Sequence, residues 1–277
     1  MVASMHKSHC RSADVHQTYN IGAVHMISKI AKEVDLQLSQ NTLSLVVVEP
    51  ANKGGLQMKI SIDRDELFSE YIMGGVSTER NEIHLEVPVG MLAEVLRHAV
   101  SAHSFRLKLS KKASPILVAV AELPSAVSAE RCVSHDIPVR VIPVASWIKV
   151  AEQEDMEAKV RSFQVQQIRI LLERMRSISS TCVFNIIKNN DGDIELIASA
   201  EIPQQVRVAT TFKEVQYPAE CGAAEVQIDI RKLSSIFGGL QTLPTSFEIH
   251  MVNKNFAHII LDFDDMRALL VAPSAVH

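Results

Sequence analysis

The sequence lacks the features of a secreted, disulfide-bonded or membrane-spanning protein. Its four cysteines, Cys10, Cys132, Cys182 and Cys221, are widely spaced and form no C-x-x-C pair. We therefore expect free thiols in a reducing compartment, with neither disulfides nor a zinc site. No apolar run approaches the roughly 18 residues that a membrane helix needs, and the first twenty residues contain no apolar signal-peptide segment. These absences predict a soluble intracellular protein with no membrane partner.

The chain also lacks a strong charge of either sign. It has 28 Lys and Arg residues against 32 Asp and Glu residues, a net charge of −4. This balance disfavours a protein that coats nucleic acid over its whole surface, but it is compatible with a basic face balanced by an acidic one. The 277 residues, 47% of them apolar, are sufficient for two globular domains that each bury a core.

Motifs for catalysis and nucleotide binding are missing as well. The glycine pairs Gly54–Gly55 and Gly238–Gly239 lack the Lys-Ser/Thr of a P-loop and do not follow a parallel strand. The dipeptide His135–Asp136 has no accompanying G-x-S-x-G nucleophile motif. We therefore expect no enzymatic activity and no cofactor. Any step that depends on ATP hydrolysis would require a separate protein.

Two groups of residues resemble metal ligands. The amino-terminal group has a spacing that matches no standard zinc site. The acidic group fits a solvated turn better than a magnesium site, because alternate strand residues point to opposite faces. We predict no metal, and keep a metal-dependent nuclease or other hydrolase built on the acidic group as the alternative of a different class. The two groups are His6, His9, Cys10 and His16, and Asp262, Asp264 and Asp265.

Internal repetition is the most informative feature that the sequence does have, with the second copy about 142 residues after the first. Residues 82–97 and 225–237 each contain an alternating strand followed by an amphipathic helix. The strands that come next, 104–109 and 246–251, also correspond. The pattern predicts a duplicated domain.

The periodicity predicts an α+β fold with antiparallel sheets, since strict alternation buries one face of a strand and leaves the other wet. We expect an amino-terminal domain over 1–123, a connector over 124–158 and a carboxy-terminal domain over 159–277. The connector contains one extended segment whose two prolines suit a sheet edge. The predicted helices are 23–34, 91–97, 165–178 and 231–237.

Each predicted helix has at least one cation on the side opposite its apolar stripe. Exposed helical faces often carry Lys and Arg, so this distribution alone does not establish a nucleic-acid surface. Acidic residues concentrate instead at strand ends and turns. The helical cations are Lys29, Lys32, Arg97, Arg169, Arg174, Arg176, Arg231 and Lys232.

Four segments resemble the Hus-type subunit of the heterotrimeric DNA-damage checkpoint clamp, which is related to the proliferating-cell sliding clamp. They are 25–32, 75–86, 134–143 and 228–233, and the similarity extends from about residue 22 to residue 273. The resemblance implies two tandem clamp domains, with sheets on an outer shell and two helices per domain on an inner face. It also implies a non-catalytic nuclear platform for checkpoint and repair proteins, which encircles double-stranded DNA with two other subunits after opening by an ATP-dependent clamp loader.

The resemblance further implies where partners bind. The helical cations would face DNA. Subunits would join edge to edge through 115–122 and 205–211, and the connector is a candidate docking surface. The interface residues would be Ile116, Val118, Val120, Val206 and Val208, and the docking residues Ile137, Val139 and Val141.

One segment departs from the family pattern. The family begins with an apolar strand, whereas residues 1–20 show no alternation, so we expect a poorly formed strand or a divergent start there. The corresponding strand of the second copy is expected near 159–163. A replicative clamp that forms rings from three copies of itself remains an alternative within the same broad class.

Overall fold

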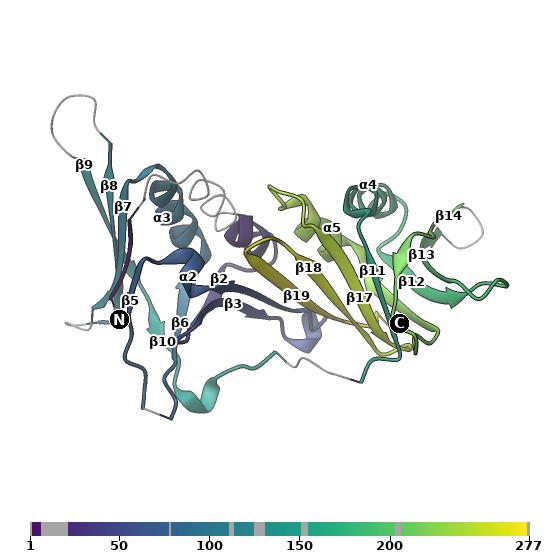
Figure 1. Ribbon diagram of the computed structural model, residues 1–277, viewed down its shortest axis with the longest axis horizontal. Helices are drawn as coiled ribbons and strands as arrows, with labels where there is room; N and C mark the ends of the chain where they lie inside the picture. Colours follow the sequence, from purple (N-terminus) through teal and green to yellow (C-terminus); the bar gives the residue numbers. More distant parts are fainter. Residues whose placement is uncertain are drawn as a thin grey trace. The chain divides into compact units, whose positions relative to one another are not determined.

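The structure is a computed structural model, and it divides into two compact units. Unit 1 contains Met1–Val47 and Ile60–Lys149, and unit 2 contains Val48–Lys59 and Val150–His277. Both are built mainly from antiparallel strands, with helices packed against them (Figure 1). The residues that the structure describes are 2–6, 22–77, 79–110, 114–124, 131–150, 155–202 and 206–275.

Unit 1 contains two sets of paired strands. The first set has the order β5-β1-β7-β8-β9, and the second has the order β10-β6-β2-β3-β4. The strands of the first set are β5 (Glu70–Ile72), β1 (Val2–His6), β7 (Ser104–Ser110), β8 (Ile116–Leu123) and β9 (Arg131–Pro138). Those of the second are β10 (Arg140–Val141), β6 (Ile83–Pro88), β2 (Glu33–Leu38), β3 (Thr42–Val48) and β4 (Gln57–Asp63), of which Val48 and residues 57–59 are assigned to unit 2.

The amino-terminal strand that the sequence did not predict is present. Strand β1 pairs with β5 on one side and with β7 on the other. Backbone hydrogen bonds to two neighbouring strands hold a segment in a sheet even when its sequence does not alternate, because the ladder uses groups that every non-proline residue has. The expectation of a poorly formed strand was therefore wrong for residues 2–6, the alternative of a divergent start stays a prediction, and residues 7–20 lie outside the described residues.

The first helix is shorter than predicted. Residues 22–28 are helical, and a turn follows before β2 begins at Glu33. Val34, which completes the apolar stripe of the predicted helix, is buried in β2, where it lies opposite Val87 of β6. The predicted apolar stripe therefore crosses two elements, the helix at 22–28 and strand β2. Residues of β2 are extended because β2 pairs with β3 and β6.

The remaining helices of unit 1 are α2 and α3. Helix α2 (Arg64–Leu67) is a single turn that the sequence analysis missed, and Asp63 caps it by accepting a hydrogen bond from the backbone N–H of Asp65. Helix α3 (Val89–Ser101) buries Val89, Leu92, Val95 and Ala99. It lies against β8 and β9 of one strand set and β6 of the other (Figure 1), so both strand sets and α3 share the core of this unit.

The predicted connector segment contributes elements to unit 1. Strand β9 pairs with β8 along its whole length, and β10 pairs with β6. A 3-10 helix, η2 (Val144–Ser146), follows Pro143. The extended conformation and the edge position expected for this segment are both present, because β9 and β10 each end the order of their strand set.

Unit 2 also contains two sets of paired strands. One set of strands has the order β19-β18-β17-β11-β15, and the other has the order β14-β13-β12-β16. The first consists of β19 (Met266–Pro273), β18 (Phe256–Asp262), β17 (Ser246–Val252), β11 (Ala158–Ser162) and β15 (Val215–Gln216). The second consists of β14 (Val206–Phe212), β13 (Ile194–Ile202), β12 (Thr181–Lys188) and β16 (Ala224–Asp229).

Two helices of unit 2, α4 (Val165–Arg176) and α5 (Ile230–Gly238), lie side by side (Figure 1). Phe247 of β17 lies 6.4 Å from Phe184 of β12 and 6.2 Å from Phe237 of α5, measured between ring centroids. All three rings are fully buried. One aromatic cluster thus joins both strand sets and a helix into a single core.

Unit 2 also includes a short hairpin from the amino-terminal half of the chain. It contains η1 (Ala51–Lys53), which ends at Gly54 with a φ of 101°. Gly55 follows with a φ of 64°. Positive φ is accessible to glycine without steric cost, so this glycine pair makes a tight turn. Within the described parts of the chain, no helix is long and apolar enough to cross a membrane.

Candidate DNA-facing and subunit-interface residues

Five of the predicted DNA-facing cations are exposed and carry no compensating charge. They lie in the turn after the first helix, on α3 and on α4. Among the residues that the structure describes, none forms an ion pair with any of the five. Uncompensated charge at an exposed site is what attracts phosphate at long range. The five residues are Lys29, Lys32, Arg97, Arg174 and Arg176.

Helix α4 shows why its cations point outward. Val165, Ile168, Leu172 and Met175 are buried on one side of the helix. The 3.6-residue period then places Arg174 and Arg176 away from that stripe. Arg169 is half-buried, and its Nε lies 3.7 Å from Glu173 Oε1, one helical turn later.

Arg231 is exposed, but Asp229 offsets its charge. The Asp229 carboxylate caps α5 by accepting from the Arg231 backbone N–H at 2.9 Å, and it lies 3.2 Å from Arg231 Nη2. Burial raises the pKa of Asp229, yet hydrogen bonds from Arg231 outweigh this effect and hold it below the ordinary value. Arg231 is therefore a weaker candidate for phosphate contact than the uncompensated cations.

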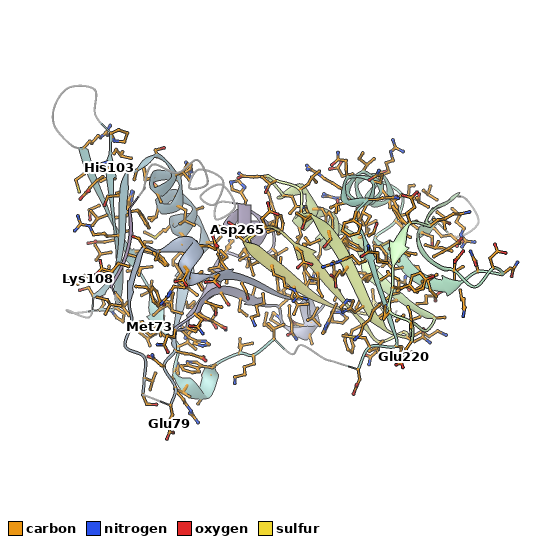
Figure 2. All side chains as sticks on the ribbon, viewed as in Figure 1. Met73, Glu79, His103, Lys108, Glu220 and Asp265 are labelled. Atoms are coloured by element: carbon orange, nitrogen blue, oxygen red, sulfur yellow. The ribbon has the colours of Figure 1, made fainter. Side chains whose placement is uncertain are left out.

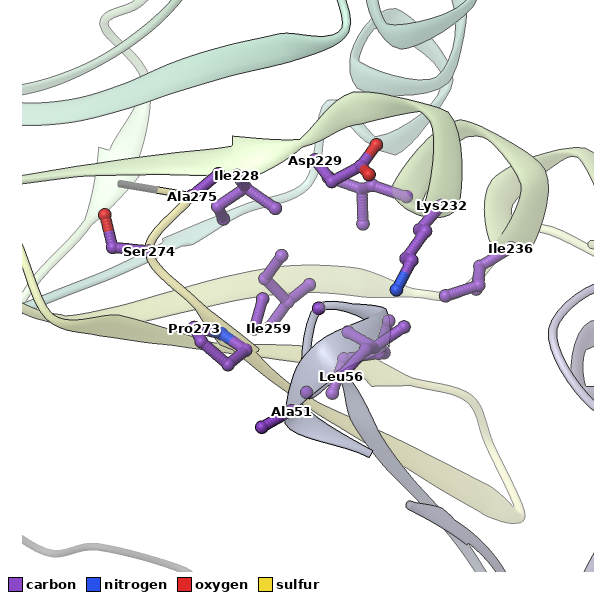
Figure 3. Close-up of a pocket in the computed structure, with 15 residues that line it drawn as sticks. Ala51, Leu56, Ile228, Asp229, Lys232, Ile236, Ile259, Pro273, Ser274 and Ala275 are labelled. Carbon is purple, nitrogen blue, oxygen red and sulfur yellow. The ribbon is translucent and has the colours of Figure 1, made fainter. Parts of the chain in front are cut away.

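Lys232 is not a free surface cation, which corrects the prediction for this residue. Its ammonium group donates to Glu49 Oε2 and to the carbonyl of Lys53. Figure 3 shows the side chain reaching from α5 toward the η1 hairpin, along a cavity of about 340 Å³. A Cβ at Gly54 would lie only 2.8 Å from Lys232 Nζ. Lys232 thus joins α5 to the hairpin within unit 2.

Six described strands lie at sheet edges, and β9 and β14 are the longest of them, with eight and seven residues. Strand β14 ends its strand set, as predicted. Strand β8, which was expected to be the other edge, pairs with β7 on one side and β9 on the other. The expectation failed because the sequence segment after β8 forms a further strand, so that β9 takes the edge position. Ile116, Val118 and Val120 remain half-buried on the face of β8 opposite its buried residues.

The edge strand β14 alternates in its exposure. Val208 pairs with Ala200 of β13 and is half-buried, whereas its neighbours Arg207 and Ala209 are exposed. Val206 pairs with Ile202 at the start of the strand. A half-buried apolar side chain on an unpaired edge is a feature that natural proteins usually cover.

The predicted docking residues of the connector separate into two groups. Ile137 and Val139 are 0% and 8% exposed, so both belong to the core and cannot contact a partner directly. Val141 is 41% exposed, as is Ile148. Between them Trp147 stacks on His84 and donates from Nε1 to the carbonyl of Ile142 at 3.0 Å. The sequence analysis missed both Ile148 and Trp147, although large apolar residues in a polar segment could have marked them.

The acidic group near the carboxy terminus does not converge on a metal site. Asp262 Oδ2 lies 2.9 Å from Arg161 Nη2, and Asp262 Oδ1 lies 3.5 Å from Arg267 Nε. Asp264 is exposed, and Figure 2 shows Asp265 at the turn between β18 and β19. In the described residues, no group of three or more His, Cys, Asp or Glu side chains could hold a metal ion.

The amino-terminal candidates for zinc binding are only partly placed. His6 ends β1, whereas His9, Cys10 and His16 lie outside the described residues. The three described cysteines are free thiols, with Cys132 exposed, Cys182 buried and Cys221 half-buried. Burial raises the pKa of Cys182 to about 12, so this thiol stays protonated and inert.

Comparison with known proteins identifies the family. Residues 15–272 match the family described as Hus1-like protein. The chain is 32% identical over 263 residues to the checkpoint protein HUS1 of Homo sapiens, covering 90% of this chain and 92% of the human protein. It is 25% identical over 249 residues to the checkpoint protein Hus1-like of Drosophila melanogaster, covering 86% of this chain and 87% of that protein.

Solved structures show the fold. PCNA from Thermococcus kodakaraensis has a TM-score of 0.71 at 12% identity, covering 98% of this chain and 99% of that chain. A chain of the PCNA2-PCNA3 complex from Sulfolobus tokodaii has a TM-score of 0.67 at 12% identity, covering 99% of both chains. This likeness confirms the predicted α+β fold of a sliding clamp. With the family match, it shows that the chain belongs to the Hus1-like family, a non-enzymatic family of checkpoint clamp subunits with the PCNA-like fold.

Proposed function

We propose that this chain is one of three different subunits that close a ring around double-stranded DNA at sites of damage. The observation that carries the proposal is that β9 in unit 1 and β14 in unit 2 are the longest edge strands among the described residues, in a chain of the Hus1-like family. One long edge strand in each unit would allow a subunit to join two neighbours. Head-to-tail contacts of this kind form a ring if the rotation closes.

Backbone pairing supplies the contact between subunits. An edge strand presents unpaired N–H and C=O groups that a second strand can satisfy. The half-buried side chain of Val208 on β14 provides apolar surface for packing beside the hydrogen bonds that a neighbouring subunit's strand would form. On β9, Val133 and His135 are half-buried on the face that also buries Ile137. The amino-terminal interface strand is therefore β9, and not β8 as the sequence predicted.

Phosphate attraction supplies the contact with DNA. A ring that slides needs dispersed cations and no side chains committed to reading bases, because base contacts would hold it at one sequence. Lys29, Lys32, Arg97, Arg174 and Arg176 meet this requirement, since they are exposed and uncompensated. Topology retains the ring on DNA, so modest phosphate attraction is sufficient.

The remaining partners follow from the lack of catalytic groups. An ATP-dependent loader must open the ring, because the chain has no P-loop. Checkpoint and repair proteins dock on the outer surface in the nucleus, and the exposed part of the connector, Val141 and Ile148, is a candidate docking site. No cofactor or metal is required for these roles.

Topological retention tests the proposal. The chain, assembled with two other checkpoint-clamp subunits, is loaded by the clamp loader and ATP onto nicked circular DNA, and the bound fraction is measured after a high-salt wash. The bound protein should survive the wash on circles and leave when a restriction enzyme linearises the DNA. Equal loss from circular and linear DNA would contradict encirclement.

Adjacent proline substitutions on β14 test the subunit contact. In an antiparallel ladder, the N–H of alternate residues points to opposite sides, so either Thr210 or Thr211 directs its N–H away from β13. Thr210→Pro and Thr211→Pro are made separately. The variant that removes the outward N–H should keep the melting temperature of the isolated chain and lose assembly. If the better-folded variant assembles as well as the unmodified chain, β14 is not the interface.

A further inference from the structure

A pair of histidines joins α3 to the edge strand β9. His135 Nε2 lies 3.0 Å from His98 Nδ1, and the ring centroids are 4.8 Å apart. Both side chains are half-buried, so solvent and small ions can reach them. His98 lies in the last turn of α3, and His135 lies in the middle of β9, opposite Ala119 of β8. Two packed elements thus hold two imidazole nitrogens toward each other.

The two facing nitrogens are placed so that both could act as metal ligands. If both facing nitrogens carried a proton, two N–H groups would point at each other, so at least one of the two must present a lone pair. Each neutral imidazole has one N–H, which can move to the other ring nitrogen. Both facing nitrogens can then present lone pairs to a metal ion.

The separation of the nitrogens fits a shared metal ion. Two nitrogens bound at a metal–nitrogen distance of about 2.1 Å lie about 3.0 Å apart at a right angle and about 3.4 Å apart in a tetrahedral arrangement. The observed 3.0 Å matches the first geometry and needs only a small rotamer adjustment for the second. We propose that His98 and His135 form a binding site for one divalent transition-metal ion.

The ligand chemistry restricts the ion. Imidazole nitrogen suits Zn²⁺, Cu²⁺ and Ni²⁺, whereas Mg²⁺ and Ca²⁺ prefer oxygen ligands. Water completes the coordination. A bound ion would tie the edge strand β9 to α3 within unit 1.

Metal titration of the full chain tests the inference, and it does not depend on ring assembly. Zn²⁺ binding is measured by isothermal titration calorimetry for the unmodified chain, His98→Gln and His135→Gln. Each substitution removes one metal ligand and should lower the Zn²⁺ affinity by at least about 10-fold to 100-fold. That range is the usual cost of removing a residue that only orients a ligand. Zn²⁺ should also raise the melting temperature of the unmodified chain, and Mg²⁺ should not.

The amino-terminal segment requires a matched control, since its histidines and cysteine could bind Zn²⁺ themselves. A variant with His6→Gln, His9→Gln, Cys10→Ser and His16→Gln should keep the site. Cu²⁺ bound to this variant should give an electron paramagnetic resonance spectrum with two equatorial nitrogens. When His98→Gln is combined with the four amino-terminal substitutions, the spectrum should show one equatorial nitrogen. Unchanged Zn²⁺ affinity in both single variants, or a loss only in the amino-terminal variant, would overturn the proposal.

Discussion

His84 lies flat against the indole ring of Trp147, with ring centroids 4.1 Å apart and planes 6° apart. Beneath the stack, His84 Nδ1 lies 3.2 Å from Asp35 Oδ2, where both side chains are buried. Burial raises the pKa of Asp35, against the lowering effects of Gln37 and His84. Trp147, in the segment after β10, therefore covers the buried polar pair formed by Asp35 of β2 and His84 of β6.

Removal of the Trp147 side chain should lower the stability of unit 1. Trp147→Ala loses the stack and the hydrogen bond to the Ile142 carbonyl, at a cost of about 2 kcal/mol in the free energy of unfolding. Trp147→Phe keeps a stacking ring and should lose about half as much. Urea unfolding followed by far-UV circular dichroism measures both, because Trp147 is the one tryptophan of the chain and its removal abolishes the fluorescence signal. Equal stability of Trp147→Ala and the unmodified chain would show that the segment after β10 is not fixed by this contact.

Lys232 and Glu49 should stabilise unit 2 as a pair. Lys232→Met removes the ammonium group that donates to Glu49 and to the Lys53 carbonyl, with an expected loss of about 2 kcal/mol. Glu49→Gln should cost less, and the double variant should cost less than the sum of the two. A double-mutant cycle from denaturant unfolding measures the coupling, and a coupling energy of zero would contradict the contact.

Acid should destabilise unit 2 through Glu248. The hydrogen bond from His250, at 3.1 Å, and the nearby Arg161 lower the pKa of Glu248 from 4.5 to about 2, although burial opposes them. A carboxyl with a lowered folded-state pKa binds fewer protons in the folded state, so its stabilisation is complete above the unfolded value. That contribution should disappear as the pH falls from about 4.5 to about 2.

Glu248→Gln provides the comparison. Its stability deficit, measured by thermal unfolding, should be largest at neutral pH and should shrink as the pH falls through this range. Asp264→Asn is the matched control, since Asp264 is exposed and the change removes one carboxylate without touching Arg161. A deficit in Glu248→Gln that stays constant with pH would exclude the lowered pKa as its cause.

Charge reversal on the helical side should weaken the contact with DNA. Changing Lys29, Lys32 and Arg174 to Glu should lower the retention of the assembled clamp on nicked circles and reduce the slope of log affinity against log salt by about 3. The control reverses Lys108, Lys213 and Lys254, which are exposed on strands and turns. Both variants change the net charge by −6, so an equal loss in both would indicate a general charge effect instead of a helix-lined channel.

The sequence predicted the repeated architecture because each copy contains long, regular patterns. The stripes of α3, α4 and α5 coincide with real helices, and the alternation of β4 and β16 coincides with real strands. Prediction failed where pairing with distant strands decided the conformation. Val34 fits a helical stripe and lies in β2, and β1 pairs without any alternation.

The candidate site was less predictable for a related reason. Helical periodicity places Lys232 at the flank of α5, but its partner Glu49 lies 183 positions earlier in the chain. Likewise, the edge position of β9 depends on its pairing with β8, which local alternation does not specify. Arg97, Arg174 and Arg176 are exposed as predicted, because exposure follows from the position of a residue on its own helix, whereas Lys29 and Lys32 are exposed in the turn after the first helix.

The mass of the assembled protein tests the central claim most directly. The chain is measured by native mass spectrometry alone, and then after mixing with two other checkpoint-clamp subunits at equal concentrations. We predict a monomer of 30.6 kDa for the chain alone and a complex with one copy of each subunit in the mixture. A stable trimer of this chain alone, with no mixed complex, would contradict a heterotrimeric ring and indicate a self-assembling clamp.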